Sequence, residues 1–198
     1  LKWLKTLELS ALQRETLDEY LLTYEYLTEK INRFDERIEE LGSTERYEKK
    51  VKQMSCLLGV KTHTALSMIV EVGDFERFEK APKFASFLGL VPSEDSSDTR
   101  VNRYSITKAG NSHLRRLLVE AAQSYTRGTI GHKSVALKQR QKGNPPEIVA
   151  YADKANERLR RRFYKMTLNK GVNRNVATTA IARELACFIW GMMTEHVS

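Results

Sequence analysis

The chain has 198 residues, and its 33 lysines and arginines against 25 aspartates and glutamates give a formal net charge of +8. Hydrophobic residues make up 41%, enough for the core of one ordinary domain with an appendage. No run of about 18 apolar residues predicts a transmembrane helix, and the N-terminus lacks the apolar region of a signal peptide. Cys56 and Cys187 are expected to be buried free thiols, and four scattered histidines suggest no metal site.

The first long segment, residues 17–41, has apolar side chains at alternating steps of three and four residues. This spacing is that of the a/d seam of a coiled coil, and Gly42 is expected to end the helix. We therefore predict a coiled-coil linker or dimerisation helix within residues 1–50. A single long surface helix of a monomer is the alternative. The seam consists of Leu17, Tyr20, Tyr24, Leu27, Ile31, Phe34, Ile38 and Leu41.

Residues 52–78 predict two short helices joined by a tight turn, the layout of a helix-hairpin-helix module. The first helix is expected to reach Leu58, Gly59 breaks it, and Thr62 or Thr64 begins the second. Such modules direct backbone N–H groups at a DNA phosphate. The usual Pro-Gly-x-Gly turn reads Leu-Gly-Val-Lys here, so a DNA contact assisted by Lys61 and a purely structural turn both stay open.

Residues 90–110 are predicted to form an irregular loop or a short hairpin, after one short helix over residues 80–92. Ser96 and Ser97 stand together between two aspartates. A serine hydroxyl needs a base or a metal to become a useful nucleophile, so the pattern alone is typical of a polar loop. The next helix, capped by Asn111 or Ser112, carries Arg115 and Arg116 in its first turn, where charge and helix dipole both favour an anion.

Positive charge gathers in the C-terminal part of the chain. Residues 99–170 hold 17 lysines and arginines against 4 acidic residues, a balance that attracts polyanions, of which nucleic acid is the commonest in a cell. A surface that only maintains solubility is the alternative. A long helix from Glu147 combines an apolar stripe with a crowd of arginines, and Gly171 is expected to end it. The last helix, from Asn175, is apolar nearly all round and is expected to be buried.

Four segments then carry a family resemblance, in the order LLGVKTHTALSMIVEVGDFERF, FLGLVPSEDSS, ITKAGNSHLRRLLVEAA and AIARELACFIW. Together they resemble the C-terminal domain of the DEDD-type insertion-sequence transposases related to the Piv DNA invertases, insertion-sequence family one-hundred-ten. The resemblance covers about residues 12–198. Its most specific part is the series Gly-Leu-x-Pro, Ser-Ser, Ile-Thr-Lys-x-Gly-Asn and Leu-Arg-Arg-Leu-Leu.

The resemblance implies a mainly α-helical part of a bacterial, cytoplasmic and nucleoid-associated DNA recombinase. In that family a RuvC-like domain with four acidic metal ligands precedes a coiled coil and a C-terminal domain that supplies a serine nucleophile. The chain would then hold the linker (1–50) and the serine domain (51–198), whose basic helical part covers 111–198. It would have no cofactor of its own, Mg²⁺ coming from the RuvC-like domain, and alone it would be inactive. The implied partners are DNA, a structured guide RNA and further copies of the chain in a dimer or a tetramer, with no membrane.

The resemblance also marks the site residues. Ser96, four residues after Pro92, is the implied nucleophile, with Ser97 as runner-up. Asp98 stands where the family has a glycine, and Tyr104 or Ser105 where it has another, which leaves an inactive copy open. The cations expected on phosphates are Lys61, Arg100, Arg103, Lys108, Arg115, Arg116, Arg158, Arg160, Arg161 and Arg162. A non-catalytic nucleic-acid-binding module and an oligomerisation module are the alternative functions.

Overall fold

A computed structural model describes residues 2–97 and 100–197; for Lys5, residues 94–97 and residues 100–104 it describes the backbone alone. The structure is mainly helical, as predicted, with one small two-stranded sheet. The chain divides into two compact units, Leu1–Glu40 and Leu41–Ser198. The helix that begins at Glu48 packs with other elements of the second unit. The division into a linker (1–50) and a C-terminal domain (51–198) stays a prediction.

The first unit holds α1 (Lys2–Lys5) and most of α2 (Ala11–Gly42). The Arg14 guanidinium donates hydrogen bonds to the carbonyl oxygens of Leu4 and Leu7, which fastens the turn between the two helices. Helix α2 is continuous through the predicted seam and ends at Gly42, as predicted. The middle of the seam, from Tyr20 to Phe34, stands in solvent, with Leu27 49% and Ile31 58% exposed. Pairing of this seam with another helix stays a prediction.

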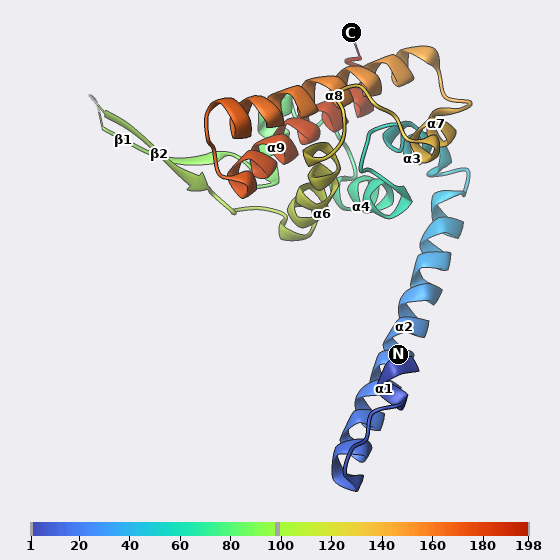
Figure 1. Ribbon diagram of the computed structural model, residues 1–198. Helices are drawn as coiled ribbons and strands as arrows, with labels where there is room; N and C mark the ends of the chain where they lie inside the picture. Colours follow the sequence, from blue (N-terminus) through green and yellow to red (C-terminus); the bar gives the residue numbers. More distant parts are fainter. Residues whose placement is uncertain (1, 98–99, 198) are drawn as a thin grey trace. The chain divides into compact units, whose positions relative to one another are not determined.

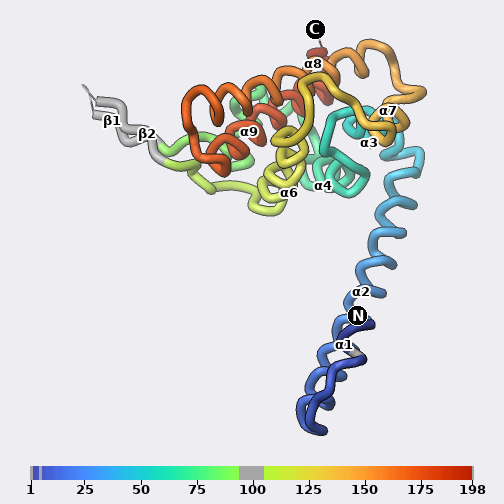
Figure 2. The backbone as a smooth tube through the Cα atoms, in the orientation of Figure 1, coloured from blue at the N-terminus to red at the C-terminus, as the bar shows by residue number. Residues whose placement is uncertain are grey.

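The second unit is built around its last helix, α9 (Arg174–Met193), which packs against α3, α5, α6 and α8 (Figures 1 and 2). Ile181, Leu185 and Ile189 are completely buried, so the predicted burial of this helix is confirmed. In length and composition α9 is the one helix of the described ranges that could cross a membrane. The remaining helices are α3 (Glu48–Met54), α4 (Thr62–Val72), α5 (Ala81–Phe87), α6 (Ser112–Ala122), α7 (Val135–Gln141) and α8 (Pro146–Tyr164).

Short irregular helices join these elements. A 3₁₀ turn, η1 (Gln123–Thr126), follows α6, and a π-helix, η2 (Lys165–Asn169), follows α8. The chain then turns at Gly171, whose φ of +60° is of the left-handed kind that glycine adopts without strain. Gly171 was predicted to end the long helix. It follows η2, whereas α8 itself already ends at Tyr164.

Strands β1 (Pro92–Ser97) and β2 (Arg100–Ile106) form an antiparallel hairpin in the stretch predicted as a loop or short hairpin. The register pairs Pro92 with Ile106 and Ser96 with Val101, with an irregularity between Pro92 and Glu94. Ser96 and Ser97 thus belong to β1. Asp98 lies outside the described residues.

The turn between α3 and α4 packs against the rest of the unit. Helix α4 begins at Thr62 as predicted, whereas α3 ends at Met54, before the predicted Leu58. Gly59 has φ +83°, and a Cβ there would lie 2.3 Å from the carbonyl oxygen of Ala121. The close approach of α6 therefore explains this glycine without a ligand, and a helix-hairpin-helix contact with phosphate stays a prediction.

Candidate nucleic-acid interface

Backbone hydrogen bonds fasten the root of the hairpin, where the chain enters β1 and leaves β2. The amide of Thr107 donates to the carbonyl of Val91 at 2.9 Å, and that of Lys108 donates to Gly89 at 3.2 Å. The amide of Asn111 donates to the Phe87 carbonyl at 3.2 Å. The segment before β1 and the segment after β2 therefore hold each other, and both are continuous with helices of the core.

Two glycines of the family-like motifs allow this close approach. A Cβ on Gly110 would lie 2.1 Å from the carbonyl oxygen of Phe87, and one on Gly89 would lie 2.6 Å from that of Ala109. Both glycines also have positive φ. Any side chain at either position would push the two segments apart. The Gly-Leu-x-Pro and Lys-x-Gly-Asn patterns are thus explained by the packing of the hairpin root.

Arg115 has a structural contact at this root. Its guanidinium Nη1 donates to the carbonyl oxygen of Leu88 at 3.0 Å, and the side chain is half-buried. A guanidinium has five N–H donors, so further contacts are not blocked. The observed use nevertheless differs from the predicted one, because the arginine ties α6 to the segment leading into β1.

The first turn of α6 is also tied to α4. Asn111 caps the helix, as predicted, by accepting a hydrogen bond from the Leu114 amide at 2.9 Å. Its Nδ2 donates to one carboxylate oxygen of Glu71 at 2.7 Å, and His113 Nδ1 contacts the other. Sequence reasoning missed this cluster because no local pattern links residues about 40 positions apart.

Three of the predicted phosphate ligands lie on the described surface of this region. Lys61 is exposed directly before α4, and Lys108 is exposed with φ +54°, unusual for a residue with a side chain. Arg116 is exposed and only 3.7 Å from Glu120, a loose pair that solvent screens. Arg100 and Arg103 belong to β2, but their side chains lie outside the described part.

A row of cations follows one face of α8, and we call it the α8 stripe. It comprises Lys154, Arg158, Arg161, Arg162 and Lys165, which line a shallow hollow together with Glu157 and Glu184. Residues 154–165 span about 17 Å of helix, roughly five steps along the axis of a duplex at about 3.4 Å each. The stripe therefore offers positive charge over a length that several phosphates of one strand also span.

Glu184 of α9 holds two arginines of the stripe in place. Its carboxylate pairs with Arg158 and, at 2.8 Å, with Arg162, while only 11% of its own side chain is exposed. The arginine side chains stay 62% and 45% exposed. A buried carboxylate under two exposed guanidiniums fixes their position and leaves their outer donors toward solvent.

Arg160 requires a correction. The prediction counted it with the surface arginines, but it is 5% exposed. Its Nε donates to Asn156 Oδ1 at 2.9 Å, and its Nη1 donates to the Arg127 carbonyl. Gly128 leaves room for the guanidinium, since a Cβ there would lie 2.8 Å from Nη1. Arg160 therefore holds the segment after α6 against α8 and cannot reach a phosphate.

The two cysteines do not contribute reactive groups to this surface. Cys56 is fully buried, and burial raises the pKa of its thiol to about 11; burial also raises the pKa of the half-buried Cys187. Both therefore stay protonated at neutral pH and are poor nucleophiles. Within residues 2–97 and 100–197, no three His, Cys, Asp or Glu side chains gather in a way that could hold a metal ion.

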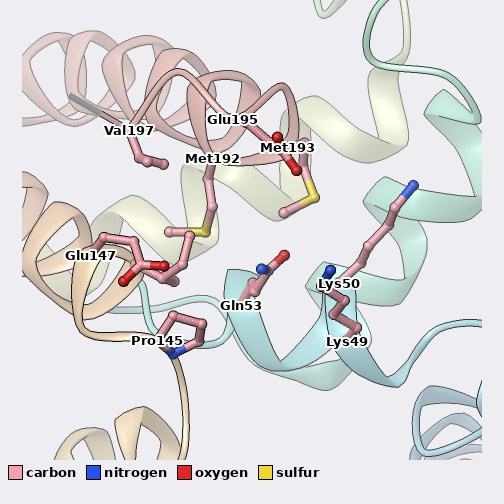
Figure 3. A pocket seen from close by; sticks show the side chains of 10 residues that line it. Lys49, Lys50, Gln53, Pro145, Glu147, Met192, Met193, Glu195 and Val197 are labelled. Carbon is pink, nitrogen blue, oxygen red and sulfur yellow. The ribbon is translucent and has the colours of Figure 1, made fainter.

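A separate hollow lies between α3, the start of α8 and the end of α9 (Figure 3). Two lysines (Lys49 and Lys50) and two glutamates (Glu147 and Glu195) stand around apolar groups such as Met192. Its charges balance, and none of the predicted site residues lines it. This hollow is therefore not part of the candidate nucleic-acid interface.

The geometry defines a helical domain that holds a serine-bearing hairpin at a fixed root and presents a cationic helix face. Comparison with known proteins agrees with this class. Residues 52–135, from the end of α3 to the start of α7, match the model of the family described as "Transposase IS116/IS110/IS902 family". The matched segment thus contains the whole hairpin and its root.

Individual relatives are transposases from several bacteria. The chain is 40% identical over 143 residues to the putative transposase y4qE of Sinorhizobium fredii, which covers 72% of this chain and 36% of that protein. It is 33% identical over 176 residues to the transposase for insertion sequence element IS1111A of Coxiella burnetii, covering 85% and 40%. The transposase for IS1533 of Leptospira borgpetersenii is 29% identical over 165 residues, covering 82% and 47%. The chain spans less than half the length of these relatives.

Proposed function

We propose that this chain is the serine-bearing, nucleic-acid-binding part of an insertion-sequence transposase that acts on DNA. The observation that carries the proposal is the hairpin root. The segment similar to the transposase family contains the two glycines, the backbone bonds and Arg115 that fasten β1 and β2 to the core. A fastened root is what a strand needs in order to present a reacting group in a defined place.

The cationic residues supply the binding in this proposal. The α8 stripe, Lys61, Lys108 and Arg116 are exposed cations, and Arg100 and Arg103 of β2 are expected to join them. Contacts of this kind neutralise phosphates and release counterions, so affinity falls steeply with salt. The expected ligands are DNA and a structured guide RNA, both of which carry such a backbone.

Ser96 supplies the covalent chemistry. Its Oγ attacks a DNA phosphorus, a bond from Oγ to phosphorus forms, and the bond from phosphorus to one strand end breaks. The hydroxyl proton leaves Oγ, and the departing oxygen takes up a proton, so the strand end becomes a free hydroxyl. The family resemblance assigns Mg²⁺ to acidic residues of a RuvC-like domain. Mg²⁺ held there would activate the serine hydroxyl and stabilise the leaving oxygen, and the described residues of this chain form no such acidic group.

The test uses the complete transposase with DNA, guide RNA and Mg²⁺. Ser96→Ala should abolish the covalent protein–DNA adduct on a denaturing gel while binding persists, because the hydroxyl forms the bond and the cations provide the affinity. Ser97→Ala is the matched control and should retain the adduct. Mass spectrometry locates the DNA remnant. A remnant on Ser97 or Ser105 would overturn the assignment, and no adduct with unchanged binding would support the non-catalytic module instead.

Self-association is a second function that one observation favours. The apolar seam of α2 is exposed over several turns, with Tyr20 72% and Phe34 53% exposed. Exposed apolar stripes at heptad spacing are typical of helices that pair with another copy. We propose that α2 joins copies of the transposase, in addition to the function of the serine domain.

A further inference from the structure

A third hollow lies at the root of the hairpin, between the start of β1, the end of β2 and the first half of α9. It measures about 330 Å³, within the size range of small-ligand sites. Figure 1 shows α9 beginning close to this end of the second unit. We call it the root cleft; it is lined by Leu90, Pro92, Ser105, Ile106, Asn175, Val176, Thr179, Ala180 and Arg183.

The walls of the root cleft are apolar and its edges are polar. Val176, Thr179, Ala180 and Arg183 follow one another at helical spacing, so they share one face of α9. Val176 is 59% exposed although it lies on a helix that is otherwise largely core, which leaves an apolar wall open to solvent. Among the side chains that the structure describes, those lining the cleft include an arginine and no acidic group. A ligand that suits these side chains is flat or compact, apolar on its faces and polar at its edge.

Arg183 is the unusual member of this set. Its Nε is buried and has no hydrogen-bond partner, and among the described side chains the guanidinium forms no ion pair. Its neighbour in sequence, Glu184, forms ion pairs with Arg158 and Arg162, although its Oε2 accepts no hydrogen bond. A buried donor without a partner costs free energy, and such groups are usually satisfied by a ligand or by water. The arginine that lines the cleft thus has one N–H group without an acceptor.

We propose that the root cleft receives one unstacked nucleobase of the nucleic acid that the domain binds. A base has apolar faces that fit the exposed Pro92 and Val176, and its polar edge has acceptors for an arginine. Arginine planes and apolar walls bind unstacked bases with little dependence on sequence. Pro92 and Ile106 line the cleft and also pair with each other in the hairpin. A base held there would place its nucleic-acid strand next to the first residues of β1, the β-strand that contains Ser96.

This inference rests on the proposed nucleic-acid binding and adds a site to it. The experiment uses the chain with single-stranded oligonucleotides carrying 5-iodouracil, a photoreactive base. After irradiation and tryptic digestion, the crosslink should map to the peptide that begins at Asn175, because trypsin cleaves after Arg174. Ala180→Leu fills the cleft and Arg183→Gln removes the donor. Each should lower affinity for the oligonucleotide about tenfold, the scale of losing one stacked base, and should remove the crosslink.

Matched controls separate the cleft from general effects. Ala150→Leu adds the same bulk to an exposed position of α8, and Lys83→Gln removes one exposed positive charge from α5. Both should retain the crosslink and the affinity. Crosslinks elsewhere, with all variants binding like the unaltered chain, would overturn the cleft while leaving the proposed function intact. No salt-dependent binding by the unaltered chain would instead overturn the proposed function.

Discussion

The guanidinium of Arg115 donates to the carbonyl oxygen of Leu88 across 3.0 Å and so connects the first turn of α6 to the chain entering β1. The residues are 27 positions apart, and the whole hairpin lies between them. Gly89 makes the contact fit, since a Cβ there would lie 2.8 Å from the same nitrogen. Arg115 lies outside both strands and therefore fixes the hairpin through the segment that leads into β1.

Arg115→Ala should destabilise the domain by about 2 kcal/mol, the scale of a hydrogen bond from a charged group. The neighbouring Arg116→Ala is the control and should change stability by less than about 0.5 kcal/mol, because its pair with Glu120 is exposed. Urea unfolding followed by circular dichroism measures both. Equal effects of the two variants would contradict the role given to the Leu88 contact.

Arg160 and Arg161 should separate stability from binding. Arg160→Ala leaves the Arg127 carbonyl and the Oδ1 of Asn156 without their donor, and should cost about 3 kcal/mol of stability while the salt dependence of DNA binding is retained. Arg161→Ala should leave stability almost unchanged and lower the slope of log affinity against log salt by about 0.9 if it contacts one phosphate of duplex DNA. Thermal unfolding and salt titrations measured on both proteins decide this, and the reverse pattern would refute the assignment.

Gly59 and Gly143 offer a comparison of two glycines with nearly the same backbone. Their φ angles are +83° and +82°, but a Cβ on Gly143 meets nothing within 4 Å. Gly143→Ala should therefore cost only the strain of a left-handed alanine, about 1 kcal/mol. Gly59→Ala adds the collision with the Ala121 carbonyl and should cost about 3 kcal/mol. If denaturant titrations give equal costs, the turn does not need its close contact with α6.

The exposed seam of α2 should control the number of copies in solution. Replacing Leu27 and Ile31 together by Glu places two charges in the seam, which is unfavourable once another helix covers them. Sedimentation should show the unaltered chain as an oligomer and the variant shifted toward monomer. A matched replacement of two exposed positions off the seam, Thr23 and Asn32, by Glu should leave association intact. An unaltered chain that is monomeric at high concentration would contradict the pairing of α2.

Much of the helical fold could be predicted from local patterns. Thr62 begins α4, Asn111 caps α6 and Gly42 ends α2 where the sequence indicated, since caps and glycine stops act within one turn of helix. For the hairpin, the sequence did not decide between a loop and strands, because its polar residues follow no alternating pattern. The backbone bonds of the root join residues on either side of the hairpin, and no local pattern indicates them.

The burial of Arg160 could not be predicted from its neighbours. Positions 158, 160, 161 and 162 are all arginine, and Arg160 borders the buried stripe of α8 beside Leu159 and Phe163. What covers it is the segment around Arg127 and Gly128, about 30 residues earlier in the chain. The root cleft was missed for the same reason, because it joins residues near position 90 to others near 180.

The backbone hydrogen bonds at the root of the hairpin have a consequence for how such domains diversify. Phe87, Gly89 and Val91 on one side, and Thr107, Lys108 and Asn111 on the other, complete their hydrogen bonds without help from the residues between them. The intervening strands can therefore be lengthened, shortened or replaced while the globule folds as before. The helical domain and the root bonds form a scaffold. We expect that the residues of the hairpin, and with them its chemistry, can be changed without changing that scaffold.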